Sequence, residues 1–240
     1  MNTSKSIRQV VLDTETTGMN RDGAVYLGHR IIEIGCVEVI NRRLTGRHYH
    51  TYIKPDREVD PEAVTVHGIT DQFLKDKPAF SEIAEEFIEF IKGADLVIHN
   101  APFDVGFMDQ EFRFFNKKTQ TTEEISTVTD TLAMAKKMFP GKRNNLDVLC
   151  DRYGIDNKHR VLHGALLDAE ILADVYLLMT GGQAKLNLSN AENGEDTIGR
   201  RPRQSTTPLT VIRATEDEEA AHQKRLDIID KSGSCLWRQS

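Results

Sequence analysis

The chain has 240 residues, of which 39% are hydrophobic and 28% are charged, and this length allows one sizeable core with sequence to spare. The formal net charge of −6 argues against a protein that coats nucleic acid through a basic surface. The 3 cysteines lie far apart without a CxxC pair and no leader peptide is apparent, which favours a reducing cytoplasm. No apolar run approaches the roughly 20 residues of a membrane span, so we expect a cytoplasmic protein without membrane contact.

Residues 1–181 are predicted to form one α/β domain. Short apolar runs predict strands at IRQVVLDT, RIIEIGCVEVI, GRHYHTYIKP, ADLVIHN and ISTVTDT, at residues 7–14, 30–40, 46–55, 94–100 and 125–131. Gly46, at the start of the third run, directly follows NRRLT, and we expect it to form a hairpin turn.

Helical periodicity alternates with these strands. Apolar residues recur at helical spacing from Phe80 to Ile91, and Gly93 supplies a C-terminal stop. Further helices are expected at FDVGFMDQEFRFF, TLAMAKKMF, NNLDVLCDRYG and GALLDAEILADVYLLMTGG.

The composition changes after residue 181. Residues 182–208 are polar and rich in Asn, Gly, Arg, Ser and Thr, which predicts a flexible linker. Residues 209–240 regain apolar positions and predict a strand, a helix that starts near Thr215, and a C-terminal end that holds Trp237. This tail is too short for a core of its own, so we expect it to fold onto a partner.

Two carboxylates mark the end of the first strand. Asp13 and Glu15 are two residues apart, so both side chains point to the same face of the sheet. Carboxylates at that distance repel each other unless a cation or a proton joins them. An ordinary polar strand end is the alternative, and these two residues alone do not decide between them.

Three further residues with ionisable side chains lie at the edges of apolar segments and are candidate site residues. Asp168 lies on the apolar stripe of its helix, where a carboxylate requires a metal ion or a salt-bridge partner such as arginine. His163 is five residues earlier, so it reaches the same site only from the loop before the helix. Asp104 opens the helix that follows the fourth strand, where the helix dipole alone also favours an acidic residue.

Together these residues resemble the DEDDh family of 3′→5′ exonucleases over about residues 7–180. The motifs LDTETTG, HNAPFD and H-x4-D occur in the order of the family, with histidine in the last motif. The resemblance implies a ribonuclease-H-like fold, a mixed central sheet flanked by helices, and two bound Mg²⁺ or Mn²⁺ ions. It assigns Asp13, Glu15 and Asp168 as direct metal ligands, Asp104 as support for the second metal, and His163 as the general base.

The resemblance also implies contacts with the 3′ end of DNA. It places the terminal nucleotide against the metal ligands Asp13, Glu15 and Asp168, against Glu62 and His67, and against the backbone from Thr16 to Gly18. Reasoning from the residues alone does not select Glu62, and VHG alone predicts a loop.

Within the family, the resemblance is to the branch of proofreading exonucleases that work with bacterial replicative DNA polymerases. It implies that residues 209–240 bind a polymerase subunit through Leu236 and Trp237. It also implies that the peptide from Gln183 to Leu188 binds a sliding clamp through Gln183, Leu186 and Leu188, and that a small accessory subunit binds the catalytic domain.

Three alternatives to proofreading remain. An RNA-processing exonuclease of the same fold would share the motifs but would not need the linker and the tail. A catalytically inactive subunit of the polymerase would not need all five chemical residues. A metal-free scaffold would hold its carboxylates in salt bridges, and a titration with metal ions would separate it from the others.

Overall fold

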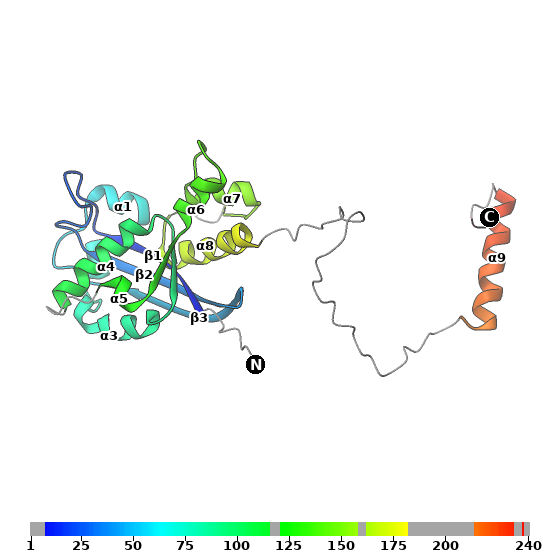
Figure 1. Cartoon of the computed structure of the whole chain (residues 1–240), viewed down its shortest axis with the longest axis horizontal. Coiled ribbons are helices and arrows are strands. Elements are labelled where there is room, and N and C mark those ends of the chain that lie inside the picture. The colour runs from blue at the N-terminus through cyan, green and yellow to red at the C-terminus, as the bar shows by residue number, and fades with distance from the viewer. Residues whose placement is uncertain (1–7, 116–120, 158–161, 182–213, 233–236, 238–240) are drawn as a thin grey trace, which may run out of the picture. The chain divides into compact units, whose positions relative to one another are not determined.

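A computed structural model of the chain describes residues 8–115, 121–157, 162–181, 214–232 and 237 (Figure 1). The chain divides into two units, residues 1–186 and 187–240. The first unit contains β1 (Arg8–Thr16), β2 (Ile31–Ile40), β3 (Arg43–Tyr52), α1 (Pro61–His67), α2 (Asp71–Leu74), α3 (Phe80–Ile91), β4 (Asp95–Ile98), α4 (Ala101–Phe115), α5 (Thr122–Ile125), β5 (Thr127–Asp130), α6 (Thr131–Met138), α7 (Leu146–Tyr153) and α8 (Ala165–Thr180). The second contains α9 (Glu216–Ser232).

One mixed sheet organises the first unit, as predicted. Its strand order is β3-β2-β1-β4-β5. Strand β1 is antiparallel to β2 and parallel to β4, while β2–β3 is antiparallel and β4–β5 is parallel. Because β1 is central, its consecutive residues Val10, Val11 and Leu12 are all fully buried. The uninterrupted apolar run in the sequence therefore reflects a strand covered on both faces.

Helices cover both faces of this sheet. One face, which includes Val10 and Leu12, packs with residues of α3 and α4. The other face, which includes Val11, packs with residues of α7 and α8 (Figure 1). Asp13 and Glu15 follow Val11 at the period of two, so they point to the face that α8 covers.

The predicted hairpin turn at Gly46 is wrong. The turn between β2 and β3 is made by Asn41 and Arg42, with φ of 51° and 64°. Asparagine tolerates this left-handed conformation, and two consecutive positive φ values match the twist of the flanking strands. Gly46, with φ of 82°, instead lies inside β3, where the register with β2 is irregular between Val37 and Val39.

At Gly35 of β2, the backbone of α8 approaches the sheet closely. A Cβ added at Gly35 would lie 2.2 Å from the carbonyl carbon of Ala165 and from the backbone nitrogen of Leu166. Gly35 is also the cross-strand partner of Asp13. The missing side chain therefore lets the first turn of α8 lie on the sheet directly beside Asp13.

We expect Gly35→Ala to destabilise the protein by about 1–3 kcal/mol, because the added methyl group meets backbone atoms that cannot turn aside. Gly106→Ala is the matched control, since its added Cβ would meet only the side chain of Tyr26, at 2.7 Å. Urea unfolding of both variants measures the difference. Equal stability of the two variants would show that α8 shifts freely on the sheet.

The longer predicted helices are confirmed at α3, α4, α6, α7 and α8. The shorter helices α1, α2 and α5 were not predicted. The helix expected near Thr215 is α9, and Thr215 and Glu218 cap its first turn reciprocally through hydrogen bonds of 2.8 and 3.3 Å. Residues 182–208 and the expected strand near residue 210 lie outside the described residues. In the described part of the chain, no helix is long and apolar enough to span a membrane.

Candidate active site

The carboxyl end of β1 opens into a cavity of about 280 Å³. This cavity brings together all five residues predicted to carry the chemistry, although they come from β1, α4 and the start of α8. The lining consists of Asp13, Thr14, Glu15, His99, Asn100, Phe103, Asp104, Asn145, Leu146, Asp147, His163 and Asp168.

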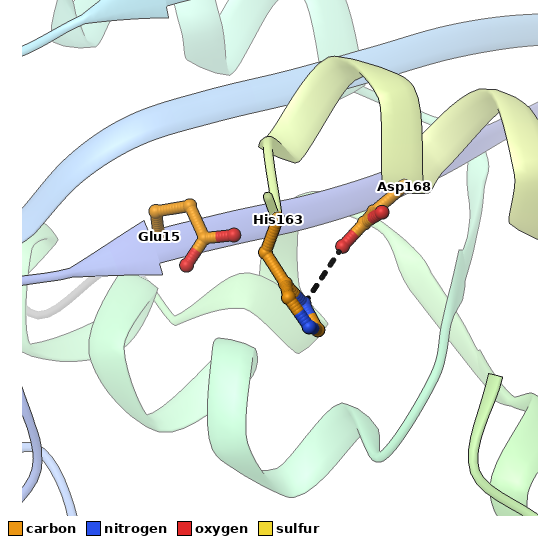
Figure 2. A group of neighbouring side chains, drawn as sticks. All are labelled: Glu15, His163 and Asp168. Atoms are coloured by element: carbon orange, nitrogen blue, oxygen red, sulfur yellow. Dashed lines mark ion pairs between the residues drawn. The ribbon is translucent and has the colours of Figure 1, made fainter. Parts of the chain in front are cut away.

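The start of α8 supplies two of these residues. His163 precedes the helix, whose N-cap is Gly164, and its imidazole is 45% exposed. Asp168 lies in the first turn and is 3% exposed. The His163 Nδ1 atom lies 3.3 Å from the Asp168 Oδ2 atom (Figure 2). His163 therefore reaches the site from the loop before the helix, as the spacing predicts.

Glu15 completes a compact group of possible ligands with these two residues. Glu15 projects from β1 toward the start of α8 (Figure 2). One ligand atom of each of Glu15, His163 and Asp168 lies within 4.8 Å of the other two. Asp13 and Asp104 line the same cavity outside this group.

Asp104 approaches from the opposite side of β1. It lies in the first turn of α4 and is 3% exposed, and its Oδ1 atom accepts a hydrogen bond of 2.7 Å from the Thr14 hydroxyl. Burial raises the pKa of the Asp104 carboxyl to about 7, although the Thr14 bond works against this shift. A carboxylate at this position is therefore costly unless a positive charge accompanies it.

Burial of Asp104 has a consequence for stability. Its pKa is higher in the folded protein than the usual 3.8, so its stabilising effect is complete at acid pH and is lost as the pH rises through about 7. In EDTA, we expect the contribution of Asp104 to the free energy of unfolding to fall between about pH 5 and about pH 8 by on the order of 1–4 kcal/mol. His29, His67 and His99 have pKa values that burial lowers, and they contribute in the opposite direction, so this fall is measured as the difference between the parent and Asp104→Asn.

Urea unfolding at the two pH values measures this loss. Asp104→Asn is expected to remove the fall that Asp104 contributes, because asparagine stays neutral. Mn²⁺ is expected to restore stability to the parent protein at the higher pH. The same pH dependence in the parent and in Asp104→Asn would show that Asp104 contributes none of it.

The donors of the cavity suit a hard divalent cation. Carboxylate oxygens are the donors that Mg²⁺ and Mn²⁺ prefer, and Asp13, Glu15, Asp104 and Asp168 provide them. The possible ligand atoms of Glu15, His163 and Asp168 are close enough to share one cation. A bound cation would also offset the cost of a charged carboxylate at the buried Asp104. The residues present therefore fit a divalent metal centre.

A second cavity of about 690 Å³ adjoins the first, since Glu15 and Phe103 line both. Its lining includes the predicted substrate-binding residues Thr16, Gly18, Glu62 and His67. Gly18 has a φ of 137°, and a Cβ there would lie 2.5 Å from the Asp60 carboxylate. Gly18 thus allows the chain after β1 to turn along the wall of this cavity.

His67 ends α1 and is 6% exposed. Its Nδ1 atom accepts a hydrogen bond of 3.0 Å from the Ile69 amide, and its Nε2 atom lies 3.3 Å from the Thr16 carbonyl oxygen. These contacts describe a neutral imidazole that donates from Nε2, and burial lowers the pKa of His67 in agreement. His67 therefore holds Thr16 in place while it lines the cavity.

Glu62 lies at the rim of this second cavity. Its carboxylate forms an ion pair with Arg21, and the two side chains are 80% and 72% exposed. Arg21 comes from the connection between β1 and β2, where sequence reasoning did not look for a site residue. Among the described residues that line the second cavity, Arg21 is the one lysine or arginine.

His99 and Phe103 are further lining residues that the sequence analysis missed. The His99 Nδ1 atom lies 2.9 Å from the Thr131 hydroxyl, and its buried Nε2 atom lacks a hydrogen-bond partner within the described part of the chain. Burial lowers the pKa of His99, so the ring stays neutral. The sequence signal for both was their place in HNAPFD, which directly follows the end of β4 at Ile98.

Of the predicted partner-binding residues, the structure describes Trp237. Trp237 is 83% exposed. Gln183, Leu186, Leu188 and Leu236 lie outside the described residues, so their predicted roles stay predictions.

The fold and the cavity define a metal-dependent exonuclease. The model of the Exonuclease family matches residues 10–176. The chain is 60% identical over 237 residues to DNA polymerase III subunit epsilon of Escherichia coli strain K12. This alignment covers 96% of this chain and 97% of the relative. The chain is 57% identical over 243 residues to DNA polymerase III subunit epsilon of Haemophilus influenzae, with 96% and 94% covered. The chain belongs to this family of epsilon subunits, which confirms the predicted family and branch.

Solved structures show the same fold. Exonuclease X in complex with 5′ overhanging duplex DNA aligns with a TM-score of 0.51 and 23% identity, over 72% of this chain and 91% of that one. Escherichia coli exonuclease I in complex with a dT13 oligonucleotide aligns with a TM-score of 0.60 and 19% identity. That alignment covers 72% of this chain and 40% of exonuclease I. These similarities confirm the predicted ribonuclease-H-like arrangement.

Proposed function

We propose that the chain removes nucleotides from the 3′ end of DNA and thereby proofreads the product of a replicative polymerase. The observation that carries this proposal is the joined pair of cavities. One gathers carboxylates and a histidine, and the other offers room for a terminal nucleotide beside them. The names of the 60% and 57% identical relatives, and the exonuclease family match, support the same activity.

The reaction is hydrolysis of the last phosphodiester bond. Two Mg²⁺ or Mn²⁺ ions, when bound, would supply the positive charge that makes water more acidic and stabilises the leaving 3′-oxygen. Asp13, Glu15 and Asp168 would hold these ions, and Asp104 would support the second. The water oxygen attacks phosphorus as the bond to the 3′-oxygen breaks, and the products are a 5′-mononucleotide and a shortened strand.

His163 would take the proton of the attacking water. Its exposed ring faces the cavity, and Asp168 lies close enough to Nδ1 to accept a hydrogen bond and orient the ring. A donor hydrogen on Nδ1 leaves the lone pair on Nε2 as the basic position. General-base help of this kind contributes about 10²–10⁴ in rate.

The second cavity would select frayed ends. The lining of this cavity has four carboxylates and one guanidinium, so its electrostatic attraction for the negatively charged DNA is weak. These groups belong to Glu15, Asp22, Asp60, Glu62 and Arg21. The terminal nucleotide must leave the duplex to reach this cavity, and unpairing costs less for a mispaired end. Mismatch preference then follows without a pocket that reads the mismatch. Glu62 would contact the terminal sugar once its ion pair with Arg21 opens.

The partners of this activity would be DNA and the other subunits of DNA polymerase III. The names of the relatives support this assembly, and a cytoplasmic location goes with it. We assign residues 209–240, with Leu236 and Trp237, to contact with the polymerase subunit. The peptide from Gln183 to Leu188 would bind the sliding clamp, and a small accessory subunit would bind the catalytic domain.

Cleavage of 5′-labelled oligonucleotides tests the activity. The purified chain would be given DNA with paired or mispaired 3′ ends and a matching RNA strand, in Mg²⁺ or in EDTA. We expect a Mg²⁺-dependent ladder that shortens from the 3′ end, fastest on single-stranded or mispaired DNA. Faster cleavage of RNA would instead identify an RNA-processing enzyme, and no cleavage would leave a structural subunit.

Binding measurements test the partners separately. Deletion of residues 209–240 is expected to abolish affinity for the polymerase subunit while it leaves cleavage of free oligonucleotides unchanged. Deletion of residues 183–188 is expected to weaken binding to the clamp alone. Unchanged affinities would reject the respective assignments without affecting the proposed activity.

A further inference from the structure

Glu33 is a buried carboxylate outside the cavity, and its two oxygens contact the start of α8 and the strand β3. It lies on β2 and is 2% exposed. Its Oε2 atom accepts a hydrogen bond of 3.2 Å from the Ala165 amide. Its Oε1 atom lies 2.7 Å from the Nε2 atom of His50 on β3. Burying a carboxylate is costly unless its partners are well placed, so this arrangement needs a reason.

The register of the sheet explains how Glu33 comes under α8. Glu33 is the cross-strand partner of Glu15 on one side and of Tyr52 on the other. Cross-strand partners share a face, so Glu33 continues the row that Glu15 begins. The neighbouring row runs from Asp13 through Gly35 to His50 in the same way. The site on β1 therefore extends across the sheet beneath the start of α8.

The Ala165 amide, which Glu33 binds, lies close in the chain to the candidate general base His163. It is the first amide of α8, one of the groups that a helix cannot satisfy internally. It is also only two residues beyond His163, whose own amide donates a hydrogen bond of 3.1 Å to the Val66 carbonyl oxygen of α1. The segment from His163 to Ala165 is thus held at one end by α1 and at the other by Glu33.

We propose that Glu33, held in turn by His50, is a positioning residue that fixes the start of α8 and with it the His163 imidazole. Glu33 is absent from the described residues that line the cavity, so it acts through His163 and not on the substrate. The proposal rests on the proposed function, because His163 matters only if the chain cleaves DNA.

Four other carboxylates among the described residues are buried, and they show what is specific to Glu33. Glu111 on α4 is 1% exposed and pairs with Arg30 at 2.7 Å. Asp104 and Asp168 line the cavity itself. Glu38, on the same strand, is 5% exposed and pairs with Arg8, at 2.6 Å, and with Arg47, at 3.4 Å. Neither partner of Glu38 lies in either cavity. Glu38→Gln is therefore the matched control for the loss of a buried charge on β2.

The kinetic test compares Glu33→Ala, Glu33→Gln and Glu38→Gln well below their unfolding temperatures. We expect Glu33→Ala to lower kcat by about 10–100-fold while KM for the oligonucleotide stays within about 2-fold, as for other residues that orient a functional group. Glu33→Gln keeps an oxygen that can accept the Ala165 hydrogen bond, so it is expected to recover most of the lost rate. Glu38→Gln is expected to lose stability and keep kcat.

A second readout does not depend on activity. The imidazole NMR signals of His163 are expected to shift or broaden in Glu33→Ala and to stay unchanged in Glu38→Gln. If the parent chain cleaves DNA but Glu33→Ala keeps both its kcat and its His163 signals, Glu33 is a structural residue only and the proposal is overturned. If the parent does not cleave DNA, the proposed function fails first, and the NMR signals still show whether Glu33 positions His163.

His50 provides a variant in case Glu33→Ala does not fold. Its side chain is 28% exposed, so His50→Gln is expected to fold while it weakens the hold on Glu33. We expect a smaller fall in kcat, about 3–10-fold, with displaced His163 signals. Parent values of both quantities in His50→Gln would overturn the proposal.

Discussion

Asp168→Asn is expected to lower metal-dependent cleavage by at least about 10⁴-fold, because the loss of one ligand charge removes several kcal/mol of stabilisation from the transition state. The side chain of Asp168 is 4% exposed, and one of its oxygens lies within 4.8 Å of a possible ligand atom of Glu15 and of His163. Asparagine has nearly the same shape and keeps an oxygen but carries no charge. The variant therefore tests the charge of the site with little change in packing.

The stability of this variant is expected to stay near that of the parent in EDTA or to rise, since a buried carboxylate becomes neutral. Calorimetric titration with Mn²⁺ and steady-state cleavage measure the two effects. Asp174→Asn is the matched control, because Asp174 lies on the same helix but is exposed. Cation binding and cleavage at parent levels in Asp168→Asn would remove Asp168 from the metal site.

His163→Ala is expected to lower kcat by about 10²–10⁴-fold while it leaves cation binding in place. The imidazole is 45% exposed at the cavity, so its removal leaves space for water and disturbs little packing. The carboxylates that hold the cations remain. The expected signature is thus a loss of turnover with retained binding of Mn²⁺ and of oligonucleotide.

Single-turnover cleavage and binding in Ca²⁺ separate these quantities. His48→Ala is the control, because His48 is an exposed residue of β3 and lines neither cavity. Turnover at the parent rate in His163→Ala would show that another group accepts the proton. The half-buried His99 lines the same cavity, and its Nε2 atom lacks a hydrogen-bond partner among the described residues, so it would then become the next residue to test.

The main parts of the site follow from local patterns in the sequence. Asp13 and Glu15 share a face because strand side chains alternate, and β1 shows this directly. Asp168 lies on the buried stripe of α8 because a helix repeats every 3.6 residues. In both cases the direction of the side chain follows from the regular geometry of a single strand or helix.

Contacts between distant elements could not be predicted in this way. The bond between Thr14 and Asp104 joins residues 90 positions apart, and the bond between Ala165 and Glu33 joins residues 132 positions apart. No local pattern sets such pairs, because the packing of α4 and α8 on opposite faces creates them. For the same reason, Gly35 looks like any strand glycine until α8 is seen against it.

The short helix α1 was missed for a different reason. Seven residues are too few to show a helical period, so only its ends carry a signal. Pro61 at the first turn and Gly68, with φ of 75° at the C-cap, mark those ends, and a search for such pairs would have found the helix. Glu62 and His67, which both line the second cavity, would then have been placed on one element.

Crystals soaked with Mn²⁺ and a 5′-mononucleotide test the central claim most directly, because the anomalous signal of manganese locates each ion. The account predicts two peaks about 3.5–4 Å apart among Asp13, Glu15, Asp104 and Asp168, with the nucleotide in the adjoining cavity beside Glu62 and His67. The absence of peaks at these carboxylates, or manganese bound elsewhere with the nucleotide, would contradict a two-metal exonuclease site.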